Sequence, residues 1–267
     1  MGHSRSPLMH NAALAALGLN WAYVPFDVAP ENVEAALAGI KALGMVGVNV
    51  TVPLKETVLP FLDEVSDTVR QIGSANTIIY RDGRLYGEST DGAGFLRALE
   101  DAGQSADNRR ALILGAGGSA RAVAFALASR GTHCRISNRT KERAQALARD
   151  INRWMPGMAS STGWGWTATA GSEDLIVNTT SVGMTPAEEA WPSLPTGSLD
   201  NQPFVYDLIY SPAETRLMMR AVANGCGTAN GVGMLVQQGA ISLSLWTGLP
   251  IERIPVAVME AAVRQSL

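Results

Sequence analysis

The apolar and polar positions in the first part of this chain alternate in patterns that predict helices and strands in turn. Helices are predicted at residues 7–17 and 31–43, and each is followed by a glycine that can end it. A strand-like run at 21–28 lies between them. A buried strand is predicted at 46–52, and Pro53 ends it.

The next part of the chain predicts a hairpin between two helices. The helices are expected at 55–62 and 93–102, and the strands at 76–81 and 84–88. Asp82-Gly83 separates the two strands, and an Asp-Gly pair between apolar runs is a strong signal for a tight hairpin.

From residue 110 onward the pattern changes to regular strand–helix units. Strands are predicted at 111–114, 133–137, 175–178 and 204–208, and helices at 119–129, 141–151, 214–223, 234–246 and 251–264. The segment 154–171, rich in Gly, Ser, Thr and Trp, gives no clear prediction. Strands that alternate with helices are typical of parallel sheets covered on both faces.

These elements predict an α/β protein of two domains, each with a mostly parallel sheet, and a cleft between the domains. The polar stretch 103–109 marks the first boundary. We expect one domain to hold 1–103 together with 234–267, and the other to hold 104–233. With 267 residues, 46% of them hydrophobic, the chain can form two cores.

Charge and composition exclude several classes of function. The net charge is −3, from 21 basic and 24 acidic residues, and no basic run suggests binding to nucleic acid or to a membrane surface. The two cysteines form no CxxC pair and the three histidines lack metal-ligand spacing, so no metal site or disulfide framework is predicted. No signal peptide is visible, and we expect a cytoplasmic protein.

A glycine-rich turn separates the strand at 111–114 from the helix that follows it. Gly115, Gly117 and Ala120 fit the G-x-G-x-x-G/A fingerprint of Rossmann-like dinucleotide-binding domains. The glycines allow a tight turn and a close approach of the backbone to a diphosphate, which the helix N-terminus attracts. The alternative is a glycine-rich turn of another Rossmann-like protein, such as a methyltransferase.

The end of the next strand indicates which dinucleotide binds. An NAD site usually carries an acidic residue there, which bonds the ribose 2′-hydroxyl. This strand instead ends at Asn138-Arg139-Thr140-Lys141, and Arg143 follows. Because a guanidinium group suits a 2′-phosphate, the site favours NADP(H). The alternative is a solvated basic start of a helix.

The strand at 46–52 delivers Thr51 and Lys55 to its carboxyl end, where open α/β sheets usually bind ligands. Burial can lower the pKa of a lysine, which suits it to proton transfer near neutral pH. The alternative is a solvated lysine at the start of the next helix. A later loop, 178–184, also follows an apolar strand, and we expect it near the nicotinamide side of the cofactor.

A series of motifs, in order along essentially the whole chain, resembles the shikimate dehydrogenase family. The motifs are 3–11, 49–56, 73–77, 89–92, the fingerprint at 115–120 with Asn138-Arg139-Thr140, and then 178–184, 207–212 and 231–240. The resemblance implies the NADPH-dependent, reversible reduction of 3-dehydroshikimate to shikimate, in the pathway to aromatic amino acids.

The resemblance also implies roles for single residues. Lys55 and Asp91 match the catalytic pair, in which an ammonium group stabilises the charge on a carbonyl oxygen and supplies the proton. Ser4 and Ser6 match the hydroxyls that hold the substrate carboxylate, and Ser6 is also expected to be the N-cap of the first helix. The further substrate contacts are Thr51, Asn76, Tyr210 and Gln238.

The remaining expected site residues lie around the cofactor. They are Gly115, Ala116, Gly117, Gly118, Ser119, Ala120, Asn138, Arg139, Thr140, Arg143, Thr179, Gly231 and Met234. His10 is expected to pack its helix, or to support a residue of the site, rather than to act as a general base.

Two departures from the family pattern stand out. The family commonly has an apolar strand before the His-Ser-x-Ser motif, whereas this sequence begins at Met1-Gly2, so the first strand is expected to be missing, which we attribute to the assignment of the start. Ser89 also stands where the family often has asparagine.

Alternatives remain for the function and the assembly. A quinate/shikimate dehydrogenase and an aminoshikimate dehydrogenase are the alternatives within the class, and a catalytically silent dinucleotide-binding regulatory protein is the alternative from another class. The expected partner is the small-molecule substrate, without nucleic acid or membrane, in a monomer or a homodimer.

Overall fold

The computed structural model describes residues 4–163, 172–190, 192–194 and 197–267. The chain separates into two compact units, which are described one at a time. Unit 1 holds Met1–Gly94 and Leu235–Ser266, and unit 2 holds Phe95–Met234 and the terminal Leu267. The chain passes from one unit to the other within helices α4 (Asp91–Asp101) and α8 (Val232–Thr247). The domain boundaries at 103 and 234 stay predictions.

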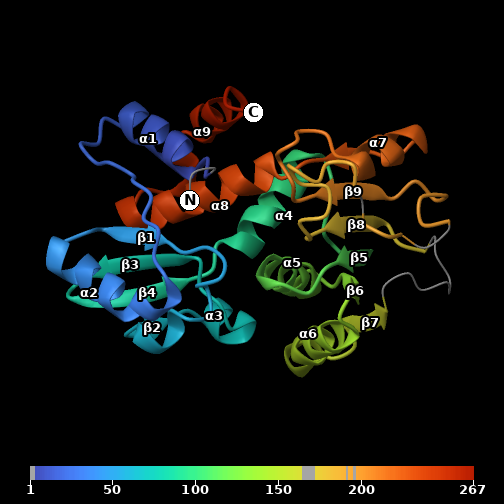
Figure 1. Ribbon diagram of the computed structural model, residues 1–267, viewed down its shortest axis with the longest axis horizontal. Coiled ribbons are helices and arrows are strands. Elements are labelled where there is room, and N and C mark those ends of the chain that lie inside the picture. Colours follow the sequence, from blue (N-terminus) through green and yellow to red (C-terminus); the bar gives the residue numbers. More distant parts are fainter. Residues whose placement is uncertain (1–3, 164–171, 191, 195–196) are drawn as a thin grey trace. The chain divides into compact units, whose positions relative to one another are not determined.

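Unit 1 is built on a mixed sheet of four strands, in the order β1-β3-β4-β2 (Figure 1). The strands are β1 (Gly47–Asn49), β2 (Glu64–Val65), β3 (Thr77–Arg81) and β4 (Arg84–Glu88). The pairs β1–β3 and β3–β4 are antiparallel, and only β2–β4 is parallel. The predicted mostly parallel sheet is therefore corrected to a mixed one, although the α/β class is confirmed.

The hairpin of unit 1 explains part of this correction. Asp82 and Gly83 have φ angles of 51° and 77°, the left-handed values that a two-residue hairpin turn requires. The strands on either side pair directly, from Thr77 opposite Glu88 to Arg81 opposite Arg84. A tight turn of this kind joins only antiparallel neighbours.

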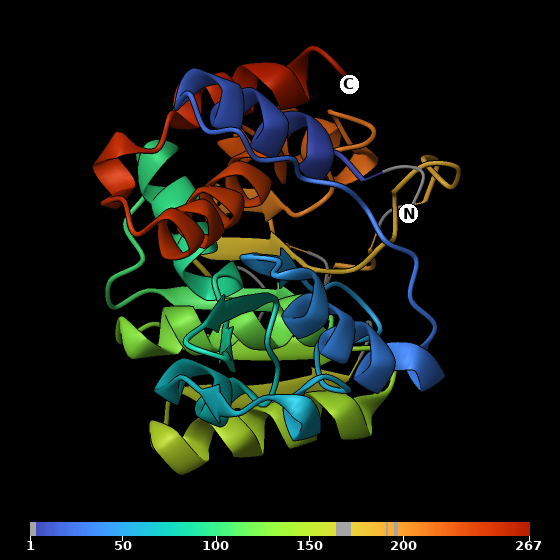
Figure 2. The same ribbon diagram turned by 90° about the vertical axis from the view of Figure 1, so that its left-hand side faces the viewer.

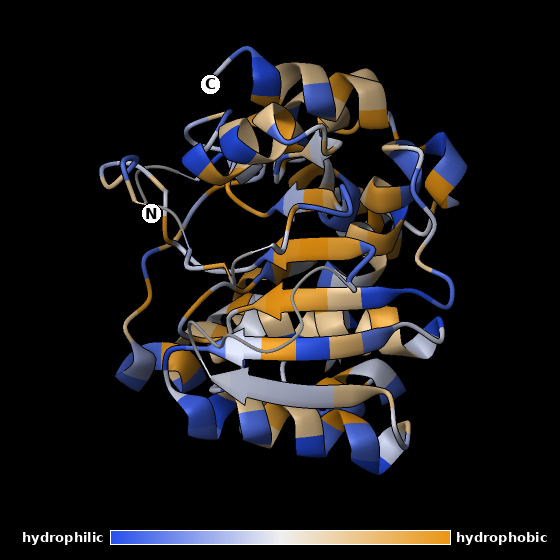
Figure 3. Cartoon of the chain, turned by 90° about the vertical axis from the view of Figure 1, so that its right-hand side faces the viewer, coloured by the Kyte–Doolittle hydropathy of each residue, from blue (hydrophilic) through white to orange (hydrophobic). Residues whose placement is uncertain are grey.

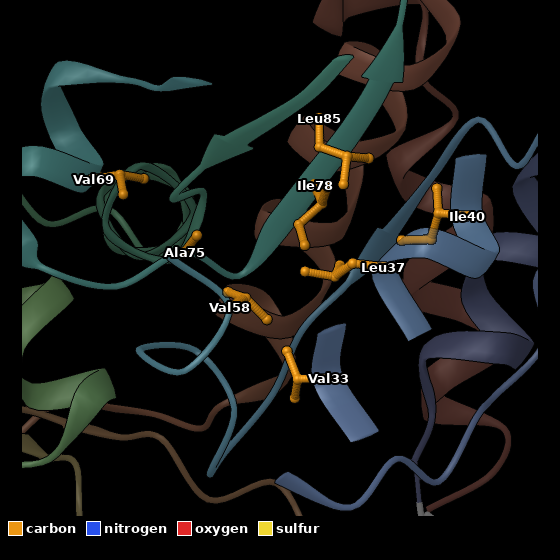
Figure 4. Packing of buried hydrophobic residues seen from close by; sticks show 8 residues of the cluster. All are labelled: Val33, Leu37, Ile40, Val58, Val69, Ala75, Ile78 and Leu85. Carbon is orange, nitrogen blue, oxygen red and sulfur yellow. The ribbon is translucent and has the colours of Figure 1, made fainter. Parts of the chain in front are cut away.

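The helices of unit 1 cover its sheet and each other. They are α1 (Ser6–Ala16), α2 (Val33–Leu43), α3 (Asp67–Ile72) and α9 (Val256–Arg264), with short 3₁₀ helices η1 (Pro30–Asn32), η2 (Leu59–Phe61) and η3 (Ile251–Arg253). Helices α1 and α9 lie side by side in both views (Figures 1 and 2). Helix α2 directs Leu37 and Ile40 towards Ile78 of β3, and these side chains form the core drawn in Figure 4.

The predicted helix at 55–62 is wrong, because the structure has turns there followed by the short helix η2. Pro60 lacks the N–H that an α-helix would use to bond the carbonyl of Glu56. The β-branched residues Thr57 and Val58 lower the helix propensity further.

The predicted strand at 21–28 is also wrong, because these residues have no regular structure. No described strand pairs with them, and β1 pairs only with β3. The side-chain amide of Asn11 instead holds the segment at Tyr23: Asn11 Nδ2 donates to the Tyr23 carbonyl at 2.9 Å, and the Tyr23 N–H donates to Asn11 Oδ1 at 2.8 Å. One amide side chain thus replaces the bonds of a neighbouring strand.

Ser6 is not the N-cap that the sequence predicts. Arg5 occupies that position, and Ser6 is already the first residue of α1. The Ser6 N–H donates to the hydroxyl of Ser4 at 3.3 Å, so Ser4 provides the side-chain acceptor at the start of this helix.

Unit 2 is a Rossmann-like α/β unit with six parallel strands, in the order β10-β9-β8-β5-β6-β7. The strands are β5 (Arg110–Leu114), β6 (His133–Asn138), β7 (Ala159–Gly163), β8 (Leu175–Asn178), β9 (Phe204–Asp207) and β10 (Thr228–Ala229). The helices are α5 (Gly118–Ser129), α6 (Lys141–Trp154) and α7 (Arg216–Ala223). Parallel order places the carboxyl ends of all these strands at one edge of the sheet.

The middle strands of this sheet are largely apolar, as their hydropathy colours show in Figure 3. All four residues of β8 are buried, as expected for a strand covered on both faces. The core on one side includes Leu112, Ile176 and Leu217. The elements β7 and β10 were not predicted, because Ala-Ser-Ser-Thr-Gly has no apolar run and Thr228–Ala229 is only two residues long.

Candidate active site

Lys55 and Asp91 form a close ion pair in unit 1. Lys55 Nζ lies 2.5 Å from Asp91 Oδ2, and the two side chains are only 13% and 10% exposed. The Lys55 carbonyl accepts the N–H of Ala75 at 2.9 Å, which holds the loop after β1 against the start of β3. The exposed pair of Lys41 and Asp63 in the same unit shows what an ordinary surface ion pair looks like here, with 39% and 35% of the side chains exposed.

Asn76 holds the other oxygen of the Asp91 carboxylate. Asn76 Nδ2 donates to Asp91 Oδ1 at 3.0 Å and also lies 3.2 Å from Gln238 Oε1 on α8. Asn76 Oδ1 accepts the N–H of Thr90 at 2.8 Å, and this fixes which end of the amide faces the carboxylate. The structure therefore brings four of the predicted residues together: Lys55, Asn76, Asp91 and Gln238.

Gly94 allows the helix that carries Asp91 to come close to the helix that carries Gln238. A Cβ atom at Gly94 would lie 2.6 Å from Gln238 Cβ, closer than real side chains approach. Any larger residue at this position would push α4 and α8 apart. The contact between Asn76 and Gln238 depends on this close packing.

Next to this group, three hydroxyl side chains form a buried cluster, to which one half-buried amide is bonded. The cluster was not predicted from the sequence. Ser242 Oγ lies 2.8 Å from Thr77 Oγ1 and 3.3 Å from Thr90 Oγ1, and all three residues are buried. Asn49 Nδ2 donates to Ser242 Oγ at 3.0 Å and to Thr77 Oγ1 at 3.1 Å. Ser242 lies one helical turn after Gln238 on α8. This spacing is the feature of the sequence that indicates that Ser242 lies near the site.

The other residues predicted to bind the substrate are less closely tied to the ion pair. Ser4 and Thr51 are exposed, and no hydrogen bond among the described residues joins either side chain to Lys55 or Asp91. Ser6 is half-buried and hydrogen-bonds to the phenol of Tyr23. Tyr210 is half-buried in unit 2, shortly after β9.

His10 packs in the interior of unit 1, as the sequence predicted. Its side chain is fully buried, burial lowers its pKa from 6.5 to about 4, and its ring stacks on Tyr23 with centroids 4.3 Å apart. Neither ring nitrogen has a hydrogen-bond partner among the described residues. His10 is therefore a neutral packing residue at neutral pH.

The predicted cofactor turn lies between β5 and α5 in unit 2. Gly115 has a φ of 111°, and a Cβ atom there would lie 2.5 Å from Thr179 Oγ1, so only glycine fits. Gly117 is the N-cap of α5, and no side chain caps the first N–H groups of this helix. A Cβ atom at Gly117 or Gly118 would meet nothing within 4 Å, so the backbone is open to a ligand.

The other residues of this turn follow from the same arrangement. Ala120 is fully buried, as the close packing of helix and strand requires, whereas Ala116 and Ser119 are half-buried. The hydroxyl of Thr179 donates to the Leu114 carbonyl at 2.6 Å, which joins the loop after β8 to the turn after β5.

The cations after β6 are exposed. Asn138 Nδ2 donates to the Thr140 carbonyl at 2.9 Å and shapes the turn that leads into α6. Arg139, Lys141 and Arg143 follow, and within the described part of the chain none of these three forms an ion pair. Unpaired cations at the start of a helix are unfavourable to its dipole, and a phosphate group would compensate for this.

A buried aspartate holds the loops at the same end of the sheet. Asp207 accepts from Asn178 Nδ2 at 2.9 Å and from the Thr215 hydroxyl at 2.7 Å. Burial raises the pKa of Asp207, and the hydrogen bonds from Thr215, Ile209 and Asn178 act against that rise. The network fixes the segment that precedes Thr179.

The last two predicted cofactor residues bond to β9 and to the loop that follows it. The N–H of Gly231 donates to the Ile209 carbonyl at 3.0 Å, and the N–H of Met234 donates to the Tyr206 hydroxyl at 3.2 Å. Both residues are buried in unit 2.

None of the helices described is both long and apolar enough to span a lipid bilayer. Residues 4–163, 172–190, 192–194 and 197–267 contain no group of three or more His, Cys, Asp and Glu residues that could hold a metal ion.

Comparison with known families matches three parts of the chain. Residues 1–78 match the shikimate dehydrogenase substrate binding domain, residues 97–158 match the shikimate / quinate 5-dehydrogenase family, and residues 231–264 match the shikimate 5′-dehydrogenase C-terminal domain. The substrate-binding match ends just after Asn76, and the second match includes the glycine-rich turn and Arg139.

Individual relatives are similar over nearly the full length. The shikimate dehydrogenase (NADP(+)) of Moorella thermoacetica is 47% identical over 269 residues, covering 99% of this chain and 90% of the relative. The shikimate 5-dehydrogenase of Thermus thermophilus, crystallised with NADP(H) and shikimate, superposes with a TM-score of 0.88 at 39% identity, covering 100% and 96% of the two chains. The 5-ketofructose reductase of Gluconobacter sp. strain CHM43 superposes with a TM-score of 0.91 at 35% identity, covering 99% and 95%.

Proposed function

The chain belongs to the shikimate dehydrogenase family, and on that premise we propose that it reduces 3-dehydroshikimate to shikimate with NADPH, with Lys55 and Asp91 as its catalytic pair. It is an NADP-dependent oxidoreductase of the shikimate pathway, which leads to the aromatic amino acids. The observation that carries the residue assignment is the ion pair at 2.5 Å, shielded from water and in contact with Asn76.

Lys55 supplies the proton in this proposal. Bound NADPH supplies the hydride when a carbonyl is reduced. Negative charge then develops on the carbonyl oxygen, and the Lys55 ammonium stabilises this charge and donates a proton to the oxygen. Asp91 keeps the ammonium in place, since one carboxylate oxygen faces Lys55 Nζ and the other is held by Asn76.

The substrate is bound by neutral polar groups. Ser4 and Ser6, at the start of α1, hold the carboxylate with their hydroxyls. The ring hydroxyls bind Thr51, Asn76 and Gln238, and Tyr210 adds a contact. Amides and hydroxyls can each donate and accept, which suits a substrate with several hydroxyl groups.

The residues of unit 2 fit NADP(H). The open backbone of Gly117 and Gly118 and the uncapped start of α5 suit the diphosphate. The 2′-phosphate binds Arg139 and Arg143, with Asn138 and Thr140 shaping that turn. The nicotinamide side is bounded by Thr179, Gly231 and Met234.

The location and assembly are part of the proposal. We place the protein in the cytoplasm, and what supports this is that both cysteines, Cys134 and Cys226, are buried and unpaired, as is usual in a reducing compartment. A monomer or a homodimer is expected.

The function is tested by initial rates at 340 nm with shikimate or quinate, each with NADP⁺ or NAD⁺. Turnover is expected to be fastest with shikimate and NADP⁺. Faster turnover of quinate would make the chain a quinate dehydrogenase. No turnover with any of the four pairs would contradict the enzymatic function and favour a silent dinucleotide-binding protein.

A further inference from the structure

Tyr23 is held in place by its neighbours on both the backbone and the ring. The Asn11 amide clamps its backbone N–H and carbonyl. Its ring stacks on His10 at an interplanar angle of 7°, and the Trp246 ring lies 6.1 Å from it. A tyrosine fixed in this way in a segment without regular structure presents its hydroxyl at one defined point.

The Tyr23 hydroxyl connects two residues of different elements. It donates to Asn49 Oδ1 of β1 at 3.0 Å and hydrogen-bonds to the side chain of Ser6 on α1. Burial raises the pKa of Tyr23 to about 12, although the Ser6 hydrogen bond acts to lower it. The phenol therefore keeps its proton, and remains a donor, throughout the neutral pH range.

Asn49 carries this connection into the buried hydroxyl cluster. Because its Oδ1 accepts from Tyr23, its Nδ2 faces the other way and donates to the Asn76 carbonyl at 3.2 Å and to Thr77 Oγ1 at 3.1 Å. The Thr77 hydroxyl lies 3.2 Å from Asn76 Oδ1. Asn76 Nδ2 in turn donates to Asp91, so hydrogen bonds run without a break from Ser6 to the catalytic pair.

We propose that Tyr23 is a positioning residue, whose hydroxyl fixes the Asn49 amide and, through it, the amide and hydroxyls that orient Asp91. This inference rests on the proposed function, since it gives Ser6 and Asp91 their roles. Every contact in the connection lies within unit 1.

Loss of the hydroxyl would affect both ends of the connection. Asn49 Oδ1 would lose its donor, which removes the preference for the present amide orientation and weakens the support of Asn76. Ser6 would lose the acceptor of its hydroxyl proton and become free to donate to the carboxylate. The first effect lowers kcat, and the second does not raise KM for shikimate.

The test is the Tyr23→Phe variant, which removes one oxygen and leaves the stacked ring. Its kcat is expected to fall by about three- to tenfold, the effect of one lost hydrogen bond, while its KM for shikimate should not rise. The dissociation constant for NADPH should stay within a factor of about two, because cofactor contacts are assigned to unit 2.

The Tyr86→Phe variant is the matched control. Tyr86 lies in β4 of the same unit beside the Arg84 guanidinium, and its hydroxyl has no hydrogen bond to any described residue. This variant should keep the kcat and KM of the parent protein. If Tyr23→Phe behaves like Tyr86→Phe, the inference is wrong.

A double variant separates positioning from a general loss of structure. In a Ser6→Ala background, Tyr23→Phe should lower kcat by the same factor as in the parent protein, because its effect acts through Asn49 and not through Ser6. Loss of the effect on kcat in that background would overturn the connection through Asn49. At the far end, Thr77→Val should lower kcat and Thr77→Ser should restore it.

The proposed function and this inference fail in different ways. If the parent protein does not oxidise shikimate with NADP⁺, the proposed function fails. If the parent protein is active and the tyrosine variants do not differ, only the role of Tyr23 fails.

Discussion

The two units build their candidate sites in opposite ways. The site of unit 1 consists of side chains that are buried and hydrogen-bonded to one another, centred on Lys55 and Asp91. The site of unit 2 consists of open backbone at Gly117 and Gly118 and of exposed cations that form no ion pair with any described residue. A group that transfers a proton must be oriented before the substrate arrives, whereas a surface that holds an anionic cofactor must keep its donors free.

The two sites also differ in the energetic cost of removing a charged side chain. An ion pair withdrawn from water is not a strong source of stability by itself, but removal of one partner leaves an unpaired charge, at a cost of about 3–5 kcal/mol in deeply buried cases. Exposed cations carry no such penalty. Substitutions in the site of unit 1 are therefore expected to affect the chemistry strongly, and those in unit 2 to affect cofactor affinity moderately.

The largest effect is expected for Lys55→Ala. We expect kcat to fall by about 10²–10⁴-fold with a smaller change in KM, because the proton donor is lost. Steady-state rates with shikimate and NADP⁺ measure this change. Lys41→Ala is the control, because Lys41 also pairs with an aspartate in unit 1, on the surface. An unchanged kcat for Lys55→Ala would exclude Lys55 as the proton donor.

The second largest effect concerns stability in acid. In unit 1 the folded pKa of His10 is about 4, below its ordinary 6.5, so the unfolded state binds more protons between these values and stability falls as the pH drops through that range. The loss is at most about 3 kcal/mol at pH 4. In unit 2 the raised pKa of Asp207 has the opposite effect on stability. The folded state binds this proton more readily than the unfolded state, so this group favours folding as the pH drops.

Amide hydrogen exchange at pH 7 and pH 5 measures this difference between the units. After correction for the intrinsic exchange rate, the protection of backbone amides should fall more in unit 1 than in unit 2 when the pH is lowered from 7 to 5. The His10→Phe variant, which keeps a ring against Tyr23, should remove most of the change in unit 1. An equal loss of protection in both units would show that His10 does not cause it.

The smallest of the three effects is expected for Arg139→Ala. The dissociation constant for NADPH should rise about tenfold and that for NADH should change little, because only the former carries a 2′-phosphate. Fluorescence titration with each cofactor measures both values. Arg153→Ala, at the other end of α6, is the control and should change neither. Equal weakening of the two cofactors would mean that Arg139 does not read the phosphate.

The same contrast between the units governs what could be predicted from the sequence. In unit 2 the apolar runs of β5, β8 and β9 and the helices between them were predicted within a few residues, since strands buried on both faces have a simple pattern. The polar strand β7 was missed because its pairing with β6, rather than its composition, makes it a strand.

In unit 1 the motifs named residues that the structure brings together, even where the predicted elements were wrong. Lys55 was expected in a helix and lies in a turn, yet its pairing with Asp91 was anticipated. The cluster of Thr77, Thr90 and Ser242 could not be predicted, because it joins residues up to 165 positions apart in the sequence. Such contacts depend on tertiary packing, which local patterns do not encode.

We expect the chemistry to depend on unit 1 and the choice of cofactor to depend on unit 2. The most direct test measures kcat and the dissociation constant for NADPH together in Lys55→Ala and Arg139→Ala. We predict a crossed result, in which Lys55→Ala lowers kcat without weakening NADPH binding and Arg139→Ala weakens NADPH binding without lowering kcat at saturating cofactor. A result in which either variant changes both quantities to a similar extent would contradict the claim.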